Sequence, residues 1–179
     1  MIKLYIVRHG STNWNDENRI QGLTDVELNY KGVKQVKELS EELNLKEIDL
    51  CITSPLKRAI KTAEILTNNE IEVISDKLLI ERNFGNLEGQ KIDYKIMKNL
   101  WDYNLNDSSN NVESLKECIS RAKKFLTKLK KKYDNKTILV VSHGSFIKAI
   151  HYNLIGYDKN TDFLSFKPMT SSLYIYDLK

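Results

Sequence analysis

Short apolar runs alternate with amphipathic segments along the chain. Five runs rich in Ile, Val, Leu and Tyr have the length and composition of strands: 2–7, 49–53, 71–74, 137–141 and 172–176. Four further segments place apolar residues at helical spacing: 31–43, 55–66, 112–129 and 145–154. Strands that alternate with helices predict a three-layer α/β/α fold around a mostly parallel central sheet.

Length and composition narrow the class of protein. The 179 residues suit a single domain over 1–179, and 41% hydrophobic with 29% charged residues is typical of a globular chain. The net charge of +4 is spread over predicted helix faces, so we expect no nucleic-acid partner. No run has the length of a signal peptide or membrane span, which predicts a cytoplasmic protein without a membrane partner. Cys51 and Cys118 lack metal-ligand spacing and are expected to be buried thiols.

Polar residues follow four of the predicted strands, at the point where each strand ends. The exits carry Arg8 with His9, then Arg58, then Glu81, and finally His143. Because open α/β sheets bind ligands at the carboxyl ends of their strands, these side chains are expected to meet in one crevice. An imidazole pair beside a guanidinium is suited to handling a phosphoryl group.

The order and content of these blocks resemble the histidine phosphatase superfamily, also called the phosphoglycerate mutase-like family. Further positions match the family's second block and the continuation of its Ser-Pro-Leu-x-Arg-Ala block: Gln21, Gly22, Asp25, Leu28, Gly32, Gln35 and residues 62–64. The matching blocks span residues 2–144 in the expected order. The resemblance therefore rests on five ordered blocks and not on one short motif.

The resemblance implies a role for each residue of the crevice. His9 is expected to attack phosphorus and form a phosphohistidine that water then cleaves. Such an imidazole must be neutral, with one nitrogen bare and the other donating to a carbonyl or similar acceptor. Arg8 and Arg58 are expected to grip phosphoryl oxygens with their planar forks, as lysine cannot. His143 is expected to be protonated and to donate to the phosphate.

Proton transfer and the rest of the pocket are assigned in the same way. Glu81 is the expected general acid and later the base that activates water, with Glu88 as a competitor in the same glycine-punctuated loop. Asn15, Gln21 and Gly22 are expected to complete the phosphate pocket as neutral donors. The family implies no cofactor and no metal ion.

Three functions remain open at this point, and the first is a phosphomonoesterase for small phosphorylated metabolites such as alpha-ribazole phosphate or sugar phosphates. The second is a cofactor-dependent phosphoglycerate mutase, which needs insertions or a C-terminal tail to exclude water. Only about fifty residues separate Glu81 from the strand that leads to His143, and the chain ends directly after its last strand. Both features favour the phosphatase.

The third function is an inactive scaffold, which the retained set of crevice residues argues against. Segment 92–112 is expected to roof the pocket, with Trp101 in the buried stripe of a helix. Dimers are common in the family, and the oligomeric state is left open.

Overall fold

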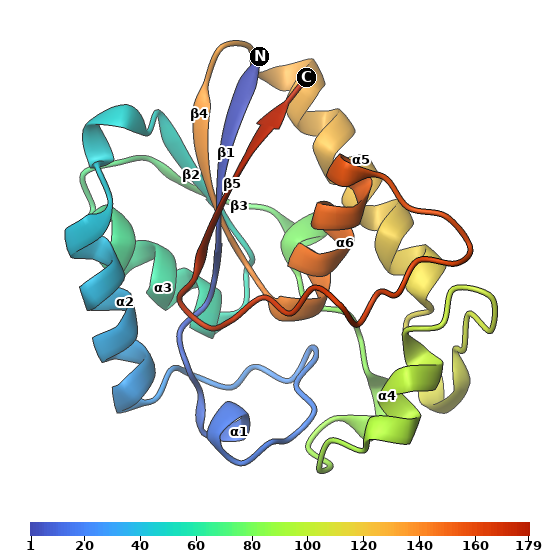
Figure 1. Cartoon of the computed structure of the whole chain (residues 1–179). Coiled ribbons are helices and arrows are strands. Elements are labelled where there is room, and N and C mark those ends of the chain that lie inside the picture. Colours follow the sequence, from blue (N-terminus) through green and yellow to red (C-terminus); the bar gives the residue numbers. More distant parts are fainter.

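A computed structural model describes all 179 residues and places a five-stranded sheet between two layers of helices (Figure 1). The spatial order of the strands is β3-β2-β4-β1-β5. The strands are β1 (Ile2–Arg8), β2 (Leu50–Thr53), β3 (Val73–Ser75), β4 (Thr137–Ser142) and β5 (Leu173–Leu178). The first four are parallel, and β5 pairs antiparallel with β1 at one edge. The expected α/β/α fold with a mostly parallel sheet is confirmed.

The helices cover both faces of this sheet. Six α-helices form: α1 (Asn13–Asp16), α2 (Tyr30–Glu42), α3 (Lys57–Thr67), α4 (Tyr94–Leu100), α5 (Leu115–Lys132) and α6 (Gly144–Ile155). Short 3-10 turns lie at Leu45–Glu47, Lys77–Leu79, Gly85–Leu87 and Ser109–Asn111. Figure 1 shows α2 and α3 on one face of the sheet and α5 and α6 on the other. No helix combines the length and the apolar character needed to cross a membrane.

Alternation along β1 explains the two-sided core. Leu4 and Ile6 belong to the larger apolar cluster, which includes residues of α5 and α6. Tyr5 and Val7 belong to the smaller cluster, which includes residues of α2 and α3. Because successive side chains of a strand point to opposite faces, a central strand covered on both sides reads as one continuous apolar run.

Two helices begin later in the chain than expected, α5 at Leu115 in place of residue 112 and α3 at Lys57 in place of residue 55. Helix α5 begins at Leu115, since Ser114 caps it and forms a reciprocal capping box with Glu117. Helix α3 begins at Lys57, and its N-cap residue Leu56 makes no side-chain cap hydrogen bond. The Ser54 hydroxyl, three positions before the helix, lies 2.7 Å from a ring nitrogen of His143.

Candidate active site

The carboxyl ends of β1, β2 and β4 bring the expected residues together. In the parallel register Arg8 lies opposite Ser142, so the residues that follow them, His9 and His143, become neighbours. Their ring centroids are 5.1 Å apart. Ser54 leaves β2 at the same level, with its N–H donating to Val141 of β4. The strand exits therefore bring the two imidazoles together at this edge of the sheet.

His9 is held in the form that a nucleophile requires. Its Nδ1 lies 2.7 Å from the carbonyl oxygen of Gly10, and a carbonyl only accepts, so Nδ1 carries the proton. Nε2 is left with its lone pair, 3.3 Å from Nε of Arg58. Burial lowers the pKa of His9 well below 6.5, and the charges of Arg58 and Arg8 lower it further. The imidazole is neutral, and its unprotonated Nε2 accepts from Nε of Arg58.

His143 is also neutral, and the expectation of a protonated ring was wrong. Its Nδ1 accepts from Nε of Arg58 at 3.2 Å, and its Nε2 therefore donates to the Ser54 hydroxyl at 2.7 Å. Complete burial lowers the pKa of His143 well below 6.5, and the nearby Arg58 charge adds to the effect. A second proton would have to point directly at a guanidinium N–H.

Arg58 lies behind both imidazoles and carries its charge in full burial. Its Nε is shared between the two rings, while Nη1 and Nη2 donate to the carbonyls of Thr24 and Gly22 at 2.9 and 2.7 Å. Burial lowers the pKa of Arg58 to about 10, so the guanidinium remains charged at neutral pH. The fork expected to grip phosphoryl oxygens thus holds the loop around Gly22. Gly22 contributes a carbonyl acceptor here, in place of the expected donor.

A cavity of about 890 Å³, which we call the Arg8 cavity, is lined by Arg8 and by Asn15, Gln21, Glu81 and Gly144, while the two imidazoles lie outside its lining. Arg8 reaches it with Nη1 bound to the Pro168 carbonyl at 2.7 Å, and its buried Nε has no partner. Four residues of segment 92–112 line the same cavity: Ile92, Tyr94, Met97 and Trp101.

Asn15 and Gln21, the expected neutral donors, share one orienting residue. Thr12 caps α1, donates its backbone N–H to Oδ1 of Asn15 at 3.1 Å, and accepts from Nε2 of Gln21 at 2.9 Å. Both amide side chains also line the Arg8 cavity. Their role as donors to phosphate stays a prediction.

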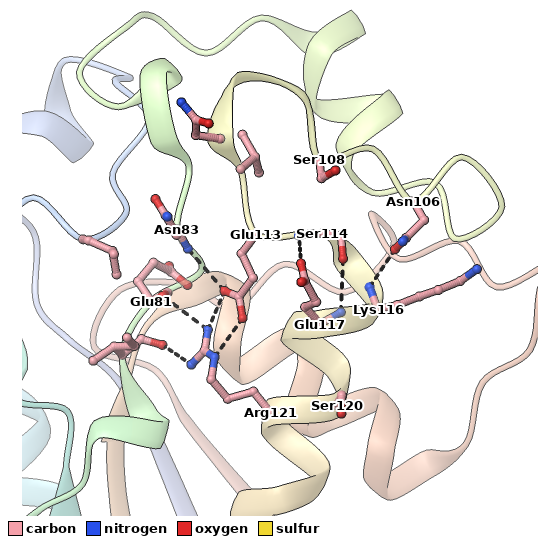
Figure 2. Close-up of a pocket in the computed structure, with 14 residues that line it drawn as sticks. Glu81, Asn83, Asn106, Ser108, Glu113, Ser114, Lys116, Glu117, Ser120 and Arg121 are labelled. Atoms are coloured by element: carbon pink, nitrogen blue, oxygen red, sulfur yellow. Dashed lines mark hydrogen bonds and ion pairs between the residues drawn. The ribbon is translucent and has the colours of Figure 1, made fainter.

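Glu81 lies at the first turn of α6. Its two carboxylate oxygens accept from the backbone N–H groups of Arg82, Ser145 and Phe146, at 2.8, 3.1 and 3.0 Å. A helix N-terminus favours negative charge, so this position suits a carboxylate. The side chain lines the Arg8 cavity and also a second cavity of about 940 Å³, drawn in Figure 2, which we call the Glu113 cavity.

Glu88 has a structural role and does not compete with Glu81. It accepts from the backbone N–H groups of Leu23, Thr24 and Phe84, and from the Thr24 hydroxyl. Burial alone would raise its pKa, but the hydrogen bonds from Thr24, Leu23 and Phe84 outweigh burial and lower it. Glu88 thereby fastens the Gly22 loop to the segment that follows Glu81.

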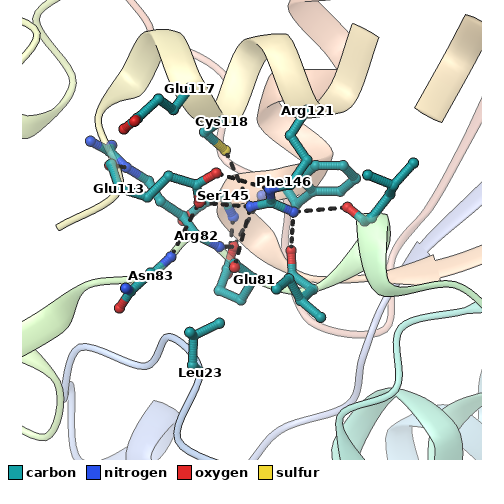
Figure 3. Close-up of polar contacts among 12 residues, drawn as sticks. Leu23, Glu81, Arg82, Asn83, Glu113, Glu117, Cys118, Arg121, Ser145 and Phe146 are labelled. Atoms are coloured by element: carbon teal, nitrogen blue, oxygen red, sulfur yellow. Dashed lines mark hydrogen bonds and ion pairs between the residues drawn. The ribbon is translucent and has the colours of Figure 1, made fainter. Parts of the chain in front are cut away.

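Two arginines that the sequence analysis missed hold the Glu81 segment in place (Figure 3). Arg82 is buried, donates to the carbonyls of Glu113 and Leu100, and lies over the ring of Trp101. Arg121 forms a two-point ion pair with Glu113 at 2.8 and 2.7 Å. Arg121 could have been noticed, because it stands beside the buried Ala122 of α5, whereas Arg82 lies between Glu81 and Asn83 and gives no such signal.

Comparison with known proteins agrees with this geometry. The family model described as "Histidine phosphatase superfamily (branch 1)" matches residues 4–179. Phosphoserine phosphatase 1 of Hydrogenobacter thermophilus is 36% identical over 165 residues, covering 88% of this chain and 78% of that protein. Phosphoglycerate mutase-like protein 4 of Arabidopsis thaliana is 33% identical over 83% of this chain and 69% of its own length.

A crystal structure of a related phosphatase has the same fold as this chain. Phosphoserine phosphatase from Entamoeba histolytica, in complex with 3-phosphoglyceric acid, superposes with a TM-score of 0.84 at 31% identity. The match covers 98% of this chain and 90% of that one. The strand-exit blocks, the imidazole pair and these matches agree, and the chain belongs to the histidine phosphatase superfamily.

Proposed function

We propose that this protein is a phosphomonoesterase that hydrolyses small phosphorylated metabolites through a phosphohistidine on His9, within one domain over residues 1–179. The observation that carries the proposal is the state of His9: it is neutral, its Nδ1 donates to the Gly10 carbonyl, and its Nε2 is unprotonated and accepts from Arg58. An imidazole held in this way needs no further proton transfer before it attacks phosphorus.

In the first step, Nε2 of His9 bonds to phosphorus while the bond from phosphorus to the ester oxygen breaks. Glu81, as the acid, gives the leaving oxygen its proton and becomes the carboxylate that the N–H groups of Ser145 and Phe146 hold. In the second step, that carboxylate takes a proton from water as the water attacks the phosphohistidine. Inorganic phosphate leaves, and both residues return to their starting forms.

Positive charge for the transferred group comes from two guanidiniums. Charge in phosphoryl transfer is spread over three equatorial oxygens, so positioned donors stabilise the transition state. The buried Nε of Arg8 has no protein partner, and Nε of Arg58 already faces Nε2 of His9. Because these groups supply the charge that metal ions supply in other phosphatases, the proposed reaction is metal-independent.

Phosphate release from p-nitrophenyl phosphate in EDTA tests this proposal. Wild type is expected to turn over in chelator, and His9→Ala is expected to be inactive, while His151→Ala keeps wild-type activity. His151 is a suitable control because it is a helix histidine bound to the Tyr176 hydroxyl at 2.8 Å and does not line the Arg8 cavity. Turnover that survives His9→Ala overturns the nucleophile assignment.

A mutase is the second candidate, because the relatives include a phosphoglycerate mutase-like protein. The two activities differ in the fate of the phosphoryl group. Rapid exchange between 3- and 2-phosphoglycerate with little free phosphate would select the mutase. Stoichiometric phosphate release from the same compounds would select the phosphatase.

A further inference from the structure

A lysine that the proposed reaction does not use lines the Arg8 cavity. Lys148 lies on α6 and is only 6% exposed, yet its ammonium forms no hydrogen bond or ion pair with the protein. Its Nζ lies 4.1 Å from the centroid of the Trp101 ring, in the cavity roof. A buried charge is costly unless it is paired, so a lysine in this setting is unusual.

Burial of the Lys148 ammonium changes its pKa. Burial lowers the pKa of Lys148 to about 8, although the charges of Glu81 and Asp162 act in the opposite direction. Lys167 and Arg82 lower it further. An anion beside the ammonium would offset the cost, and the protein supplies none within ion-pair distance.

Helix α6 connects Lys148 to the expected phosphoryl site, because its first residue, Gly144, lies against Arg8. Gly144 starts α6, and a Cβ built on it would lie 3.3 Å from the guanidinium carbon of Arg8. Lys148 follows four residues later, on the same helix face and about 6 Å further along the axis. Arg8 and Lys148 also line the same cavity, so a ligand with two anionic groups on a short aliphatic chain can place one group at each cation.

The Arg8 cavity is lined by more cationic than acidic side chains, which favours a ligand with two anionic groups. Its cations are Arg8, Arg19, Lys148 and Lys167, and its acids are Glu81 and Asp162. Arg19 is already paired with Glu17, and Glu81 is held by backbone N–H groups. Of the two remaining lysines, Lys167 is exposed to solvent and Lys148 is buried.

We propose that Lys148 is the second-anion subsite of this enzyme and selects phosphomonoesters that carry another anionic group, a carboxylate or a second phosphate, a short chain away from the scissile one. The inference rests on the proposed phosphatase function. The phosphoryl group is bound at Arg8 and His9, and the ammonium of Lys148 pairs with the second anion. Lys148 is a specificity residue and takes no part in bond breaking.

Matched substrate pairs test the subsite. Phosphoserine differs from phosphoethanolamine by a carboxylate, and 3-phosphoglycerate differs from glycerol 3-phosphate by a carboxylate in place of a hydroxymethyl group. Wild type is expected to favour the carboxylated member of each pair. Propane-1,3-diol bisphosphate against the monophosphate of the same diol forms the second-phosphate arm. The arm with the larger preference identifies the anion.

Lys148→Met removes the charge and keeps an unbranched apolar side chain that is one heavy atom shorter. We expect it to lower kcat/KM for the preferred anionic substrates by about 10- to 100-fold, mainly through KM, as for loss of a hydrogen bond to a charged group. Turnover of p-nitrophenyl phosphate, which carries no second anion, should fall less than turnover of the anionic substrates, and urea unfolding checks separately that the fold is intact. Lys148→Arg should restore part of the preference. Lys98→Met, an exposed lysine of α4 outside the cavity lining, is the matched control.

Two results would overturn the subsite. One is an unchanged ratio between the members of each pair in Lys148→Met, and the other is equal loss on p-nitrophenyl phosphate, which would give Lys148 a structural role. If wild type hydrolyses none of these esters, the proposed function fails by itself. Calorimetric titration with 3-phosphoglycerate then tests the subsite, which predicts binding to wild type that is weakened about tenfold or more in Lys148→Met.

Discussion

Arg121 fastens the segment that carries Glu81 to helix α5, and Arg121→Met tests how much the protein depends on that contact. The methionine keeps the apolar stem and loses every N–H donor. In the wild type, Arg121 donates to both carboxylate oxygens of Glu113 at 2.8 and 2.7 Å. It also donates to the carbonyls of Leu78 and Ile80, at 2.8 and 2.7 Å.

The expected magnitude follows from burial and from the number of groups left without a donor. The side chains of Arg121 and Glu113 are each 16% exposed. Breaking a fully buried ion pair on one side costs about 3–5 kcal/mol, and water that reaches the rim reduces this to about 2–4 kcal/mol. For a domain of 179 residues, such a loss lowers Tm by about 5–15 °C.

Urea unfolding at neutral pH measures this loss, with Lys123→Met as the control on the same helix, because Lys123 is exposed. Glu113→Gln leaves the bonds from Arg121 to the carbonyls in place and is expected to cost about 1–2 kcal/mol. The double variant should cost less than the sum of the two single variants, because the residues share one interaction. A loss below about 1 kcal/mol for Arg121→Met, or strict additivity, would refute the reasoning.

Two further predictions concern the framework of the site. Gly32→Ala would place a Cβ 2.1 Å from a backbone oxygen of the loop after β1, so we expect the free energy of unfolding to fall by about 1–3 kcal/mol in urea. An unchanged urea midpoint would contradict it. Because burial holds the pKa of His9 and His143 well below 6.5, the unfolded chain binds protons below pH 6.5 that the folded imidazoles do not. The free energy of unfolding should therefore decrease as the pH is lowered below 6.5, by up to about 1.4 kcal/mol per pH unit for each imidazole. Urea titrations at several pH values measure this dependence, and a free energy that does not change with pH would exclude it.

The fold could be predicted because its signals are local. The apolar run of β1 and the helical spacing of α2 and α5 depend only on neighbours in the chain. The antiparallel direction of β5 could not be read in the same way, since it depends on how segment 156–172 crosses the edge of the sheet. The contact of the Ser54 hydroxyl with His143 could not be read locally either, because the two residues lie 89 positions apart in the chain.

The site could be predicted as a set of residues but not as a set of protonation states. The positions of His9 and His143, each directly after a parallel strand, were enough to predict that the two side chains are neighbours. Whether His143 carries one proton or two depends on where Nε of Arg58 points, and that is set by the carbonyls of Gly22 and Thr24. No spacing along the chain encodes this direction.

The unusual position of Lys148 could have been recognised from the sequence, because a charged residue interrupts an apolar run. It stands within the apolar run 146–150, where Phe146, Ile147, Ala149 and Ile150 are fully buried. A lysine at such a position must either reach the surface along its stem or end in a cavity. The Arg8 cavity supplies the second outcome here.

One continuous segment, from β4 through the first turns of α6, therefore carries much of the chemistry. It places the imidazole of His143, holds the carboxylate of Glu81 with two backbone N–H groups, and ends one turn later at Lys148. Because these groups share a single strand–helix junction, a shift of α6 would move the acid and the proposed second-anion contact together. Lys148→Met instead changes charge at the far end and leaves the junction itself intact. Selectivity should thus be separable from turnover at this position, whereas substitutions at Gly144, against the Arg8 guanidinium, should impair both.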